Sequence, residues 1–169
     1  MAPISDDLAE LRNQLGKGVL QRAYGSIVGY MSQLRSYFVA RDGDRAVSAL
    51  YQGTFDMTYF ALFPPPLKAR GLKLAIVFDY GSLVFEVWLA ARNRTLQRRY
   101  WQLLCDGGWS AHRLVEPAAG VDAIVVREAA AAVDLVAPDA LTSRIEAAAQ
   151  ELLNDLVAFL EAHDAQEAV

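Results

Sequence analysis

Hydrophobic residues recur at helical spacing in four segments of the chain. The clearest segment has apolar side chains four, three, four, three and four residues apart: Leu20, Tyr24, Ile27, Met31, Leu34 and Phe38. This spacing places all of them on one stripe of an amphipathic helix. Weaker patterns of the same kind predict helices over 4–15, 92–105 and 139–163.

Between these helices lie apolar runs that are typical of β-strands. The predicted strands are 53–62, 72–79, 83–91, 112–115 and 121–129. The turn-forming sequence DYGS at 79–82 joins the second and third strands into a hairpin. With Tyr80 and Gly81 as a two-residue loop, Phe78 faces Leu83 and Ile76 faces Phe85, which puts the large apolar side chains on one face.

The order of elements predicts the fold class. We expect an α+β fold in the order ααβββαβ(β)α, with a mostly antiparallel four- to five-stranded sheet and helices packed on one main face. A length of 169 residues favours a single domain over 1–169.

Composition narrows the possible functions. Hydrophobic residues make up 54% of the chain and charged residues 21%, with a net charge of −4. We therefore expect neither nucleic-acid binding nor attachment to an anionic membrane. The apolar runs are too short to span a bilayer. The surplus of apolar and aromatic residues for this size predicts a homodimer.

Localisation and redox state follow from simple features. Cys105 is the single cysteine, so no intramolecular disulfide and no cysteine zinc cluster can form. The N-terminal sequence lacks the features of a secretory signal. We expect a cytoplasmic protein, and the high Ala and Arg content indicates a bacterial source. His112 and His163 lack metal-ligand spacing, and we expect no cofactor.

One group of polar residues is a candidate binding site. Alternation in the first strand puts Asp56 and Thr58 on one face, and the hairpin puts Lys73, Glu86 and Trp88 on its less apolar face. If the two faces coincide, the five residues form a patch for a small ligand or a protein partner. If they are only solvated, Lys73 and Glu86 form an ordinary surface ion pair.

We therefore expect a non-catalytic interaction or ligand-binding module, and a metal-dependent phosphodiesterase or nuclease of degenerate PD-(D/E)xK type is the alternative. The element order resembles the PD-(D/E)xK nuclease core, in which two carboxylates hold a divalent metal and a lysine supports the attacking water. Asp79 and Glu86 would be the acids and Lys73 the lysine. The chain departs from the motif because Trp88 stands at the lysine position and no proline precedes Asp79.

Four arginines lie within eight residues of the chain, namely Arg92, Arg94, Arg98 and Arg99. They could bind an anion or an acidic partner, or form the solvated side of an amphipathic helix. Both interpretations stay open at this point.

Two resemblances complete the picture. The sequences YQGTFDMTYFALFP, LKLAIVFDYGSLVFEVWLAARN and RRYWQLL, with GVDAIVV further on, resemble an uncharacterised family of small bacterial proteins, a domain of unknown function. The resemblance spans roughly residues 10–160 and implies no activity. The element order is also similar to that of secretion-chaperone-like α+β domains, which implies dimerisation and the binding of partner segments.

Overall fold

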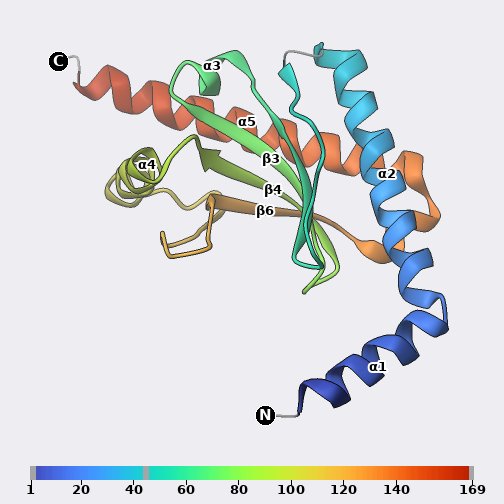
Figure 1. Ribbon diagram of the computed structural model, residues 1–169. Helices are drawn as coiled ribbons and strands as arrows, with labels where there is room; N and C mark the ends of the chain where they lie inside the picture. The colour runs from blue at the N-terminus through green and yellow to red at the C-terminus, as the bar shows by residue number, and fades with distance from the viewer. Residues whose placement is uncertain (1–2, 44–45, 168–169) are drawn as a thin grey trace.

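The computed structural model describes residues 3–43 and 46–167 and has the predicted α+β fold (Figure 1). The helical elements are α1 (Ile4–Gly16), α2 (Val19–Asp42), α3 (Pro65–Lys68), α4 (Arg94–Asp106), the 3-10 turn η2 (Ala132–Val136) and α5 (Pro138–Glu167). The strands are β1 (Tyr51–Gln52), β2 (Met57–Leu62), β3 (Leu72–Asp79), β4 (Val84–Ala91), β5 (Arg113–Leu114) and β6 (Ala123–Ala131).

The strands form one antiparallel sheet in the order β1-β2-β3-β4-β6-β5. The sheet has six strands, more than the four or five predicted, because the two-residue strand β1 pairs with β2 at one edge. At the other edge the equally short β5 pairs with β6.

Helices α2 and α5 cover one face of the sheet, and α4 lies near the end of β4 (Figure 1). The stripe predicted for 20–38 packs on this sheet from Ile27 onward, with Met31, Leu34 and Phe38 at most 1% exposed, whereas Leu20 is 36% exposed. Their side chains belong to one hydrophobic cluster with Ile76 and Phe85 of the sheet. The prediction of helices on one main face is therefore confirmed.

The β3–β4 hairpin has the predicted faces but not the predicted register. Phe78 pairs with Phe85 and Ile76 with Val87, a shift of two residues from the expected pairing. The cause is a longer turn, in which Leu83 adopts a left-handed conformation with φ of 56°. A shift of two preserves the side-chain alternation, so the apolar face is still the face that α2 and α5 cover.

Candidate functional site

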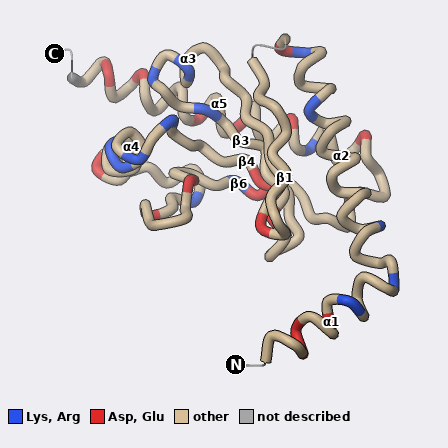
Figure 2. The backbone as a smooth tube through the Cα atoms, in the orientation of Figure 1, with Lys and Arg blue, Asp and Glu red and all other residues tan. Residues whose placement is uncertain are grey.

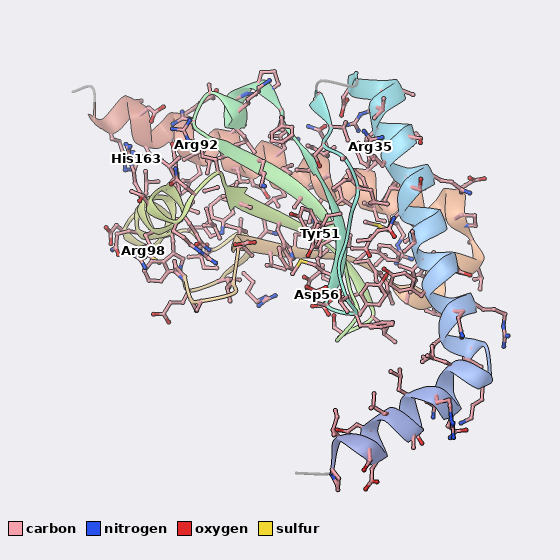
Figure 3. All side chains as sticks on the ribbon, viewed as in Figure 1. Arg35, Tyr51, Asp56, Arg92, Arg98 and His163 are labelled. Carbon is pink, nitrogen blue, oxygen red and sulfur yellow. The ribbon has the colours of Figure 1, made fainter. Side chains whose placement is uncertain are left out.

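Asp56 lies in a turn and not in a strand, which corrects the sequence-based prediction. Strand β2 starts at Met57, and the backbone N–H of Gly53 donates to the Met57 carbonyl at 2.9 Å across the turn. Phe55 has a φ of 60°, which interrupts the strand predicted for 53–62. The Asp56 side chain is exposed at the tip of the β1–β2 hairpin, so its charged carboxylate is open to solvent and needs no buried partner (Figure 3).

Thr58 is buried on the helix-covered face of the sheet, opposite Phe78. Its hydroxyl lies 3.0 Å from the hydroxyl of Tyr80. Burial raises the pKa of Tyr80 above its ordinary value, so this phenol stays protonated at neutral pH. Thr58 therefore belongs to the core and does not share a face with Lys73, Glu86 or Trp88.

Lys73, Glu86 and Trp88 do lie on the opposite face of the sheet, as their positions predict. The indole N–H of Trp88 donates to Glu86 Oε2 at 2.6 Å, and Arg113 Nη2 lies 3.8 Å from Glu86 Oε1. Lys73 and Glu86 make no ion pair with each other in the described part of the chain. This observation rules out the cross-strand pair in its predicted form.

A shallow hollow on this open face is lined by Lys73 and Trp88, together with Met57, Tyr59 and Asp122. Its volume is about 20 Å³, which is room for about one water molecule. The predicted five-residue patch is thus divided among a turn, the core and the open face of the sheet. Binding of a partner by Lys73, Glu86 and Trp88 stays a prediction.

Asp79 and Glu86, the two acids of the nuclease alternative, accept hydrogen bonds from neighbouring groups. Asp79 Oδ1 accepts hydrogen bonds from the backbone N–H of Gly81 at 2.6 Å and of Ser82 at 3.0 Å. Asp79 therefore stabilises the hairpin turn, as turn aspartates commonly do. Within residues 3–43 and 46–167, no group of three or more His, Cys, Asp and Glu side chains is placed to hold a metal ion.

The four arginines differ in their surroundings. Arg94 Nη2 lies 3.3 Å from Asp122, and the same guanidinium donates to Gln97 Oε1 at 2.8 Å. Arg94 thus holds the loop before β6 against α4. The exposed side chains of Arg92, Arg98 and Arg99 make no ion pair with another described residue, and Figures 2 and 3 show basic residues gathered near and on α4.

A much larger cavity lies elsewhere, between the C-terminal end of α2, the middle of α5 and the segment that joins β2 to α3. Its volume is about 910 Å³, within the range of small-molecule sites. Its wall is mainly apolar: Ala46, Leu62, Phe63, Pro64, Pro65, Leu74, Ala149 and Leu153. The polar lining side chains are Arg41, Asp42, Lys68 and Gln150.

The two basic groups at this cavity are not equivalent. Arg41 donates to both Asp42 oxygens, at 2.7 and 2.6 Å, and to Glu146 Oε1 at 2.8 Å. The hydrogen bonds with Asp42 hold the pKa of Arg41 above its ordinary value. The exposed Lys68 makes no ion pair with any described residue. Lys68 is therefore the cation that an anionic group at the mouth of the cavity would meet.

Sequence reasoning missed this cavity. The prolines at 64–66 indicated only the end of a strand, and Lys68 only a short helical turn. The walls come from α2, β2, β3 and α5, and no spacing along the chain shows that these segments meet.

The described residues form an α+β fold with an antiparallel sheet, two helices that cover one face of it, and a large, mainly apolar cavity. None of the helices in the described residues is long and apolar enough to cross a bilayer. The chain belongs to the family described as Domain of unknown function (DUF7000), whose model matches residues 4–160. No curated protein and no solved structure matches the chain.

Proposed function

We propose that this protein is a non-catalytic binding module whose cavity holds a small amphipathic molecule with an anionic group. The observation that carries the proposal is the cavity of about 910 Å³, with apolar walls and with Lys68, a cation that makes no ion pair with another described residue, in its lining. Binding sites for small molecules typically combine such walls with a few polar groups that orient the ligand.

The chemistry of the lining defines the ligand class. Phe63, Leu74 and Leu153 would cover a hydrocarbon or aromatic body, which removes apolar surface from water. A carboxylate, phosphate or sulfonate would sit near Lys68 and form a charge-assisted hydrogen bond. Catalysis has less support, because Asp79 serves the hairpin turn and Glu86 bonds to Trp88.

The test is a fluorescence titration with 8-anilinonaphthalene-1-sulfonate, a probe with apolar rings and an anionic group. We expect saturable binding that Lys68→Glu weakens by about tenfold, because charge reversal replaces attraction with repulsion. Leu153→Trp should reduce binding further by filling the cavity. Both variants should keep the wild-type circular dichroism spectrum.

Lys73→Glu is the matched control, because Lys73 lies on the open face of the sheet, outside the cavity. Its affinity for the probe should equal that of the wild type. Loss of binding in Lys73→Glu with normal binding in Lys68→Glu would refute the cavity as the binding site and would favour the open surface of the sheet. If the probe bound the wild type and all variants equally, neither the cavity nor the open face of the sheet would be its binding site.

A further inference from the structure

Helix α1 carries an apolar stripe that no other described part of its own chain covers. Ile4, Leu8, Leu11 and Leu15 are 72%, 58%, 47% and 40% exposed, and α1 has no buried residue. In Figure 1 this helix extends away from the body of the protein, beyond the start of α2. A row of exposed aliphatic side chains on a folded protein usually marks an interaction surface.

The spacing of the stripe specifies the kind of partner. The four residues are separated by four, three and four positions, the pattern of the a and d residues of a coiled coil. Leu8 and Leu15 take a positions, and Ile4 and Leu11 take d positions. The surface therefore fits another α-helix with a similar apolar seam.

The charges beside the stripe indicate that this second helix is a copy of α1. Asp7 precedes Leu8 at a g position, and Arg12 follows Leu11 at an e position on the other flank. Neither side chain makes an ion pair with a described residue of its own chain. A uniformly acidic partner would be repelled by Asp7 and a uniformly basic one by Arg12, whereas an identical helix complements both.

The same two residues define the orientation. In a parallel pair, a g residue faces the e residue five positions later on the other helix. Asp7 of each copy would then face Arg12 of the other, and the twofold axis would repeat the contact. An antiparallel pair would place the two acidic flanks together and the two basic flanks together.

We propose that α1 pairs in parallel with α1 of a second copy to form a twofold-symmetric dimer. The seam would also cover Val19, which is 53% exposed just after the break between α1 and α2. A 13-residue helix buries little surface, so the dimer should dissociate in the micromolar range. The proposal concerns α1 alone and does not depend on the ligand cavity.

The experiment is sedimentation velocity on the full chain over a range of concentrations. We expect a monomer–dimer equilibrium for the wild type and a monomer for Leu8→Ser/Leu11→Ser, with unchanged secondary structure. Val133→Ser/Val136→Ser is the matched control. It removes side chains that are 73% and 88% exposed in η2, and it should dimerise like the wild type.

Charge reversal tests the orientation. Asp7→Arg and Arg12→Asp should each weaken self-association by about tenfold, because like charges then face each other. An equimolar mixture of the two variants should recover dimers, since each variant supplies the charge that the other lacks. Absence of recovery would overturn the parallel arrangement. A wild-type chain that stays monomeric, or a Leu8→Ser/Leu11→Ser variant that still dimerises, would overturn the proposal as a whole.

Discussion

Replacing Thr58 with valine separates a structural role from a role in binding. Valine has nearly the same shape as threonine, so packing against Phe78 should be preserved while the hydroxyl is lost. The Tyr80 hydroxyl, 3.0 Å from Thr58 Oγ1, then loses a partner inside the protein. Thr58 is fully buried, and the change removes a hydrogen bond without creating a large void.

The expected cost is about 1 kcal/mol, the typical net contribution of one hydrogen bond inside a protein. For a domain of this size, that loss lowers the melting temperature by about 3 °C. Tyr80 is only half-buried, so water can reach its hydroxyl and limit the penalty. The cost should therefore stay well below that of a fully orphaned polar group.

The assay is urea unfolding followed by tryptophan fluorescence, with all variants at one protein concentration because association would stabilise the folded state. A double-mutant cycle with Tyr80→Phe should give a coupling energy of about 1 kcal/mol. Probe binding to the cavity should be unchanged in Thr58→Val. A coupling energy of zero would refute the hydrogen bond as a source of stability, and loss of probe binding would refute our assignment of Thr58 to the core.

Two further predictions concern other parts of the fold. Gly53→Ala should destabilise the protein by about 1–3 kcal/mol in the same urea assay, because an added Cβ would lie 2.5 Å from the Met57 carbonyl oxygen. Glu146→Gln should reduce the acid sensitivity of stability. Hydrogen bonds from Tyr37 and then Arg41 lower the pKa of Glu146 below its ordinary value of 4.5. Its contribution is therefore present above about pH 4.5 and is lost as the pH falls through the lowered pKa. The stability difference between wild type and Glu146→Gln should shrink on acidification in urea titrations at several pH values, and a constant difference would contradict this account.

Much of the fold could be predicted because a helix or strand that is buried on one face has apolar residues at regular spacing in the sequence. Helix α2 shows this most clearly, since its spacing from Ile27 to Phe38 matches the face that packs on the sheet. The β3–β4 hairpin shows the limit of the method. Alternation gives the face of each residue but does not distinguish registers that differ by two, and here the turn geometry at Leu83 decides the register.

The candidate site was predicted less well, and Asp56 shows the reason. Its neighbours, from Tyr51 to Leu62, form an apolar run that is typical of one continuous strand. A turn interrupts this run, and it depends on the φ of 60° at Phe55, which hydrophobic alternation does not reveal. The assumption that Thr58 shares a face with Lys73 also fails, because Thr58 pairs with Phe78 on the helix-covered face, whereas Lys73 lies on the other face.

The surplus of apolar residues that predicts a dimer lies in two places in the structure. Most of it forms the core between the sheet, α2 and α5, which needs no second chain. The part on α1 is exposed and forms the proposed seam. The fluorescent probe could bind either the cavity or this seam, since both are apolar. Probe binding that Lys68→Glu weakens and Leu8→Ser/Leu11→Ser leaves intact would assign the probe to the cavity. Probe binding that Leu8→Ser/Leu11→Ser weakens and Lys68→Glu leaves intact would assign the probe to α1. The ligand proposal would then fail, and only sedimentation would test the dimer proposal.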